Sequence, residues 1–148
     1  MTLKAQIQND MQEAMKAGDK DRLKVVRLLR AAIKQIEIDQ RTELDDPDVL
    51  RVIEKMVKQR RDSAAQFQQG GRRDLADIEL AEISVLEQYL PEPLSNAELD
   101  AMIEQSIADT GAVSIRDMGK VMGQLKARAQ GRADMSTVGA RVKARLAQ

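Results

Sequence analysis

Apolar residues recur every three or four positions along most of the chain, and this spacing constrains the fold more than any other feature of the sequence. An α-helix places residues at this spacing on one face, whereas a half-buried strand would alternate at every second residue. Only Phe67 and Tyr89 are aromatic, so the aromatic and β-branched pairs that favour strands are scarce. We therefore predict an all-α, multihelical fold with an aliphatic core that methionines help to fill.

Capping residues and helix breakers divide this pattern into seven predicted helices. Ser, Thr and Asp favour helix starts, Pro fits the first turn, and Gly favours helix ends. In the N-terminal part, helices are expected from a cap at Thr2 to the stop at Gly18, from a cap at Asp19 or Asp21 to about Thr42, from Asp45–Pro47 through Phe67 to a stop at Gly70-Gly71, and from Leu75 to Leu90. In the C-terminal part, they are expected from Ser95–Glu98 to Thr110, from a cap at Ser114 through Leu125, and from Gly131–Asp134 through Leu146.

The segment Pro91-Glu92-Pro93 is the clearest boundary in the chain. Two prolines within three residues keep the backbone extended and prevent one helix from running through it. Ser95 and Glu98 then form the pattern of a capping box, which starts a new helix. We predict an N-terminal four-helix subdomain over residues 1–90 and a small C-terminal three-helix subdomain over residues 94–148.

The chain contains no Cys and no His. It therefore has no disulfide, no thiolate metal site, no Cys nucleophile and no Ser-His-Asp triad. The usual side chain for proton transfer near pH 7 is missing as well. We predict no catalytic residues, no metal and no cofactor, and we do not expect the chain to be an enzyme on its own.

Equal numbers of acidic and basic residues conceal an uneven distribution of charge. Residues 111–148 contain eight basic and two acidic side chains, whereas residues 95–110 contain four acidic side chains and no basic one. Local basic density attracts phosphate backbones whatever the net charge of the whole protein. The alternative is an ordinary solvated helix surface, with Lys and Arg near the C-terminal end of a helix dipole.

The predicted sixth helix has two distinct faces at about 100° per residue. Its apolar arc comprises Ile115, Met118, Val121, Met122 and Leu125, and its opposite arc comprises Arg116, Gly119, Lys120, Gly123 and Ala127, with Lys126 at the edge. A glycine inside a helix costs about 1 kcal/mol relative to alanine. The two glycines would let a sugar–phosphate backbone or a partner's helix approach closely. Equally, the first four helices of the chain could pack on them.

Several motifs, in order along the chain, resemble those of the YqeY family. They are Lys16–Lys20, Arg27–Ala32, Lys58–Ser63, Glu87–Pro91, Asp117–Gly123 and Gly131–Asp134. YqeY proteins are similar to the C-terminal helical tail of GatB, the tRNA-binding subunit of an amidotransferase that amidates Glu-tRNA(Gln) or Asp-tRNA(Asn). That tail helps to hold the tRNA. The resemblance implies a helical N-terminal part, a three-helix C-terminal part, and matching positions at residues 119–123 and 131–133.

We therefore predict a stand-alone module that binds the backbone of tRNA or another structured RNA. The residues expected to make contact are Arg116, Gly119, Lys120, Gly123, Lys126, Arg128 and Arg132. One alternative is an accessory of a glutamine-dependent amidotransferase, a carbon–nitrogen ligase whose chemistry resides in a partner. The other is an adaptor that binds a partner's helix. Without a long apolar segment, we expect a cytoplasmic location and no membrane partner.

Overall fold

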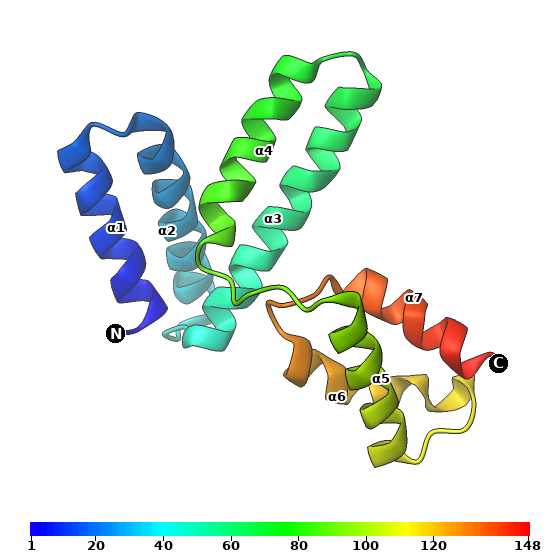
Figure 1. Cartoon of the computed structure of the whole chain (residues 1–148). Helices are drawn as coiled ribbons and strands as arrows, with labels where there is room; N and C mark the ends of the chain where they lie inside the picture. Colours follow the sequence, from blue (N-terminus) through cyan, green and yellow to red (C-terminus); the bar gives the residue numbers. More distant parts are fainter. The chain divides into compact units, whose positions relative to one another are not determined.

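The computed structural model describes all residues from 1 to 148 and consists entirely of helices and their connections (Figure 1). This confirms the predicted all-α fold. The elements are α1 (Leu3–Ala17), α2 (Lys20–Gln40), α3 (Asp46–Gln69), α4 (Arg73–Glu87), α5 (Asn96–Thr110), the 3₁₀-helix η1 (Ile115–Asp117), α6 (Met118–Ala129) and α7 (Met135–Leu146).

The helix starts follow the predicted caps. The side chains of Thr2, Asp19 and Asp45 accept hydrogen bonds from backbone N–H groups in the first turns of α1, α2 and α3. Ser95 forms the predicted capping box with Glu98 at the start of α5. These bonds satisfy N–H groups that have no partner within the helix, which explains why the short polar residues fix the helix boundaries.

The chain divides into two compact units, Met1–Leu90 and Pro91–Gln148. In the first unit, α1 packs on α2 and α3 packs on α4 (Figure 1). Their apolar faces enclose one aliphatic core that includes Ile7, Val26, Leu29, Ile53 and Leu86, none of which is exposed to solvent.

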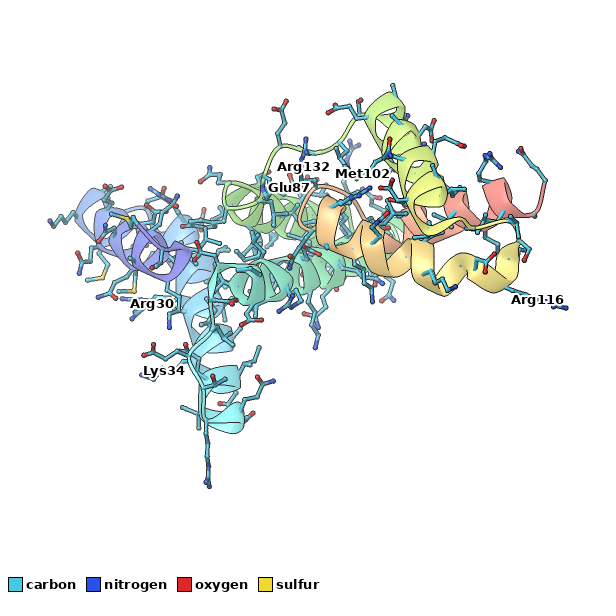
Figure 2. The ribbon with its side chains drawn as sticks, turned by 90° about the horizontal axis from the view of Figure 1, so that it is seen from below. Arg30, Lys34, Glu87, Met102, Arg116 and Arg132 are labelled. Carbon is cyan, nitrogen blue, oxygen red and sulfur yellow. The ribbon has the colours of Figure 1, made fainter.

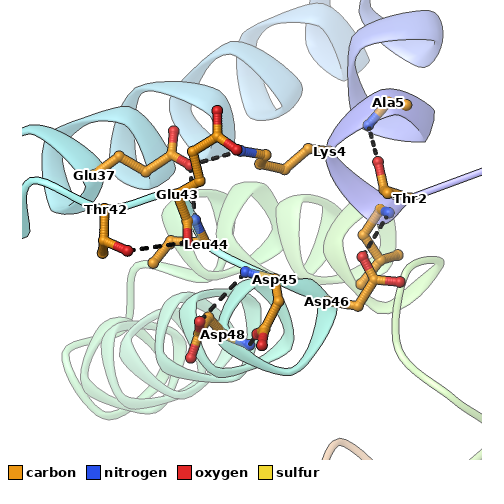
Figure 3. A network of polar contacts seen from close by, with 11 residues as sticks. Thr2, Lys4, Ala5, Glu37, Thr42, Glu43, Leu44, Asp45, Asp46 and Asp48 are labelled. Atoms are coloured by element: carbon orange, nitrogen blue, oxygen red, sulfur yellow. Dashed lines mark hydrogen bonds and ion pairs between the residues drawn. The ribbon is translucent and has the colours of Figure 1, made fainter.

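Polar contacts join the start of α1 to α2 and to the first residue of α3 (Figure 3). The Glu37 carboxylate accepts hydrogen bonds from Lys4 Nζ at 2.6 Å and from the backbone N–H of Leu44 at 2.9 Å. The bond from Lys4, followed by that from Leu44, lowers the pKa of the Glu37 carboxyl below its ordinary value. Asp46 accepts from the backbone N–H of Leu3 at 3.0 Å.

The second unit has its own aliphatic core between α5, α6 and α7. Val121, Leu125, Val138 and Val142 are fully buried there, together with most of Ile103. The backbone N–H of Leu94 donates to the carbonyl of Arg132 at 2.8 Å, which fastens the start of this unit to the loop before α7.

Two predicted helix boundaries were wrong. Helix α4 ends at Glu87 rather than at Leu90, and a 3₁₀ turn precedes α6. The carboxylate of Asp117 accepts hydrogen bonds from the N–H groups of Val113 and Ser114, which closes this tighter turn. A 3₁₀-helix has three residues per turn, so Ile115 rotates off the apolar arc predicted for an α-helix, and 46% of it is exposed.

Two large apolar residues that follow the helical spacing are also exposed. Met15 in α1 is 51% exposed and Ile78 in α4 is 53% exposed. Helices α3 and α4 instead bury two small residues, Ala64 and Ala76. The spacing of large apolar residues predicted the helices correctly, but it did not identify every buried position.

Candidate nucleic-acid interface

The two glycines of α6 lie on its solvent-exposed side. A Cβ atom placed on Gly119 or Gly123 would have no neighbouring atom within 4 Å. Both residues are exposed, whereas Val121 and Leu125 on the other side of α6 are fully buried. Packing inside the C-terminal unit therefore does not explain why α6 contains these glycines.

A third glycine, Gly139 in α7, faces the methionines of α6 and was not identified from the sequence. A Cβ atom at this position would lie 3.8 Å from Cε of Met122 and 3.9 Å from Cε of Met118. These are ordinary van der Waals distances to the flexible ends of two methionines, so alanine would also fit at this position. The sequence does indicate that Gly139 lies on the apolar face of α7. It follows Met135 by four residues and precedes Val142 by three.

Two of the predicted site cations are engaged within the fold. Arg128 donates hydrogen bonds to Oγ of the buried Ser106 at 3.3 Å and to the Asp109 carboxylate at 2.8 Å. The bond from Arg128 is the main cause of a lowered pKa of the Asp109 carboxyl. Arg132 donates to the backbone carbonyl of Glu92 at 2.9 Å and lies 3.8 Å from the Glu98 carboxylate. Both side chains thus hold segments of the C-terminal unit together.

Two arginines of α7 pair with α5 in the same way. Arg141 donates to Asp100 at 2.7 Å, and Arg145 donates to Glu104 at 2.5 Å. The four carboxylates of α5 therefore neutralise half of the eight cations in the basic C-terminal stretch. This pairing between helices is tertiary, so a count of charges along the sequence did not predict it.

The remaining cations of η1 and α6 have no carboxylate partner. They are Arg116, Lys120 and Lys126, and all three are exposed. Arg116 projects outward from the C-terminal unit (Figure 2). Lys120 makes a minor contribution to the lowered pKa of the nearby Asp117 carboxyl, which is caused mainly by the hydrogen bond from Val113. We call Arg116, Gly119, Lys120, Gly123 and Lys126 the glycine–lysine strip.

The side chains of the glycine–lysine strip limit the chemistry that the strip itself could supply. It contains no carboxylate, hydroxyl or thiol that could transfer a proton or attack a substrate. No group of three or more carboxylates in the chain is arranged to hold a metal ion. The exposed cations and bare backbone of the strip would be complementary to a ligand that carries negative charge along a ridge.

These features define a small all-α protein of two helical units joined by a proline-containing linker. A family model described as YqeY-like protein matches residues 4–146, almost the whole chain. The chain belongs to this family, as its motifs predicted.

Curated relatives extend the comparison to fungi. The chain is 37% identical over 109 residues to "Altered inheritance of mitochondria protein 41, mitochondrial" of Kluyveromyces lactis, an alignment that covers 71% of this chain and 58% of that protein. The protein of the same name from Lachancea thermotolerans is 34% identical, with the same coverage. An uncharacterised Schizosaccharomyces pombe protein is 34% identical over 94 residues, or 64% of this chain and 76% of that protein. The chain thus spans less than two thirds of the length of the two relatives named mitochondrial.

These relatives contradict the expected cytoplasmic location, because the names of several of them state that they are mitochondrial. The expectation rested on the absence of a long apolar segment, which does not distinguish the cytosol from the interior of an organelle. In the structure, no helix combines the length and the hydrophobicity needed to cross a bilayer.

The open position of Gly123 makes a direct prediction about stability. Gly123→Ala should stabilise the C-terminal unit by about 1 kcal/mol, because alanine loses less backbone entropy in a helix and the new methyl group has space. For a unit of this size, thermal unfolding should shift upward by about 4–8 °C. Gly111→Ala in the same unit is the control, because the space around it is equally open but its φ of +69° is strained for alanine. A lower melting temperature for Gly123→Ala would show that the position is not open.

Proposed function

We propose that the protein binds the phosphate backbone of a structured RNA, with tRNA as the first candidate, through the glycine–lysine strip. The observation that carries this proposal is the exposure of Gly119 and Gly123 beside cations without carboxylate partners. Backbone contacts of this kind fix position rather than read sequence. With two aromatic residues in the chain, stacking on unpaired bases is not part of the proposal.

Two further considerations support it. Interior glycine lowers helix stability, so a helix with two exposed glycines gives up stability that its own fold does not require. The family resemblance points the same way, because the tail of GatB helps to hold tRNA. Arg128 and Arg132 change role in this proposal, since they hold the strip in place instead of contacting phosphate.

Neutralising the two lysines of the strip tests the proposal. Lys120→Ala/Lys126→Ala should weaken binding of total tRNA and reduce the slope of log affinity against log salt by about two, one for each lost phosphate contact. Electrophoretic shifts at several salt concentrations measure both quantities. Lys143→Ala is the matched control, because it removes an exposed lysine without a partner from α7 of the same unit. Circular dichroism confirms that each variant folds.

An unchanged affinity and slope in the double variant would contradict the phosphate contacts. Gly123→Leu tests whether the RNA backbone approaches α6 closely. The leucine side chain should block this approach and weaken tRNA binding, with less effect on the salt slope. Amidation of Glu-tRNA that appears only when amidotransferase subunits are added would instead favour the accessory function.

A protein partner is the second candidate, and an observation at one end of the strip favours it. Val113 is 86% exposed and Ile115 is 46% exposed, next to Arg116. Exposed aliphatic side chains gain nothing from a phosphate backbone, whereas a protein surface would bury them. Loss of partner binding in Val113→Ser, with no tRNA binding by the wild-type chain at any salt concentration, would support this candidate.

A further inference from the structure

Helix α2 has a second face that its own fold does not use. Val25, Val26, Leu29 and Ile33 turn toward the core of the N-terminal unit. At about 100° per residue, measured from these four residues together with Ala32 and Ile36, which also pack against the core, the ten residues within about 85° of the opposite direction contain no carboxylate. They form what we call the α2 basic face, namely Lys20, Leu23, Lys24, Arg27, Leu28, Arg30, Ala31, Lys34, Gln35 and Ile38.

Five of these residues are cations, and none has a carboxylate partner within hydrogen-bond distance. Arg30 contacts only the sulfur of Met11, at 3.0 Å. In contrast, Arg22 on the flank of the same helix lies 3.7 Å from the Asp10 carboxylate. Figure 2 shows Arg30 and Lys34 directed away from the helix on one side. From Lys20 to Lys34 the cations extend over about 21 Å of helix.

This arrangement opposes helix stability. Lys20 and Lys24 are four residues apart, as are Arg30 and Lys34, and such like-charged neighbours repel each other by about 0.2–0.5 kcal/mol. Lys20 is also the first residue of α2, at the positive end of the helix dipole. Asp19 and Asp21 in the first turn and Glu37 near Lys34 offset part of this repulsion, but none of the five cations forms an ion pair within the chain, so an external anionic surface could still bind them.

Apolar side chains are interleaved with the cations, and they indicate which anionic surface fits. Leu28 is 42% exposed and Ile38 is 60% exposed. Leu23 and Leu28, together with Lys20, Lys24 and Arg27, line a shallow hollow of about 380 Å³. A phosphate backbone alone would leave these aliphatic groups in water. The interface of an anionic bilayer accepts cations at the headgroups and aliphatic groups just below them.

We propose that the α2 basic face binds the surface of anionic lipid bilayers, so that the protein associates with membranes peripherally. The proposal departs from the expectation of no membrane partner, which rested on the absence of a segment long enough to cross a bilayer and not on the surface of the helices. A cluster of four to eight Lys or Arg on one helix is typical of proteins that recognise anionic lipids. The proposal is independent of RNA binding by the glycine–lysine strip, which belongs to the other unit.

Sedimentation of the full chain with vesicles tests the proposal. The wild-type protein should bind vesicles of phosphatidylcholine mixed with phosphatidylglycerol, should not bind vesicles of phosphatidylcholine alone, and should dissociate as salt rises. Lys24→Gln/Arg27→Gln should lower the partition coefficient about 25-fold, or about fivefold for each cation removed. Leu28→Ser should lower it several-fold without changing its dependence on salt.

A matched control distinguishes this face from charge in general. Lys55→Gln/Lys58→Gln removes two exposed cations from α3 of the same unit at the same spacing, and it should bind anionic vesicles as the wild type does. Equal loss in this control, or no binding of wild-type protein to anionic vesicles, would overturn the proposal. So would loss of tRNA binding, but not of vesicle binding, in Lys24→Gln/Arg27→Gln, because the face would then be a second RNA surface. Variants of the glycine–lysine strip should bind vesicles normally, so the two proposals can fail separately.

Discussion

Leu125→Ala should unfold the C-terminal unit while helices α1–α4 stay folded. Leu125 is fully buried at the centre of the core between α5, α6 and α7. Replacing a buried leucine by alanine costs about 2–5 kcal/mol, which approaches the whole stability expected of a unit of this size, at about 0.05–0.15 kcal/mol per residue. Hydrogen exchange measured by mass spectrometry should show loss of protection after Pro91 and normal protection before it.

The reciprocal variant is the control. Leu29→Ala makes an equivalent cavity in the core of the N-terminal unit and should remove protection there instead. If either variant removed protection from both units in one step, the chain would unfold as a single cooperative body. The independent subdomains predicted from Pro91-Glu92-Pro93 would then be wrong.

Glu82→Ala should destabilise the N-terminal unit by about 2 kcal/mol, although the ion pair that it breaks is not a short one. Nε of Arg60 lies 3.2 Å from the Glu82 carboxylate, and the two side chains are only 15% and 14% exposed. Arg60 also donates to the carbonyl of Met56 at 3.3 Å. Removing Glu82 leaves a mostly buried guanidinium without its counter-charge, and the cost approaches the value of about 3–5 kcal/mol for fully buried pairs.

Glu87→Ala is the matched control in the same helix. Its partner Arg61 lies closer, at 2.7 Å, but the side chains are 56% and 45% exposed. Solvent screens such a pair, so this variant should change stability by less than about 1 kcal/mol. Urea unfolding followed by circular dichroism compares the two variants. Equal effects would show that burial does not determine the strength of these pairs.

Much of the fold could be predicted because it depends on local chemistry. Thr2, Asp45 and Ser95 cap helices through contacts within three residues, and a sequence pattern contains all the information for such contacts. The exposure of Met15 and Ile78 could not be predicted in this way. The burial of each residue depends on which helix lies opposite, and helical periodicity does not specify this.

Those features of the candidate site that depend on a single helix could also be predicted from the sequence. The two faces of α6 follow from its own periodicity, so the open position of Gly123 was within reach of the sequence. The pairing of Arg128 with Asp109 joins α6 to α5 across 19 residues of sequence, and that of Arg145 with Glu104 joins α7 to α5 across 41. Such pairs depend on how the helices pack, which is why the basic stretch was predicted to be more exposed than it is.

Arginine supplies the cation in every ion pair of the structure except the one between Lys4 and Glu37. The planar guanidinium can hold a carboxylate with two parallel bonds, as Arg145 does with Glu104, and an ammonium group cannot. Arginines therefore form nearly all of the ion pairs within the fold, whereas most lysines form none. Acetylation or mutation of Lys120 or Lys126 can change the surface potential without disturbing an internal contact. Substitutions at the lysines can therefore change which ligands such a protein binds, while the ion pairs between its helices stay the same.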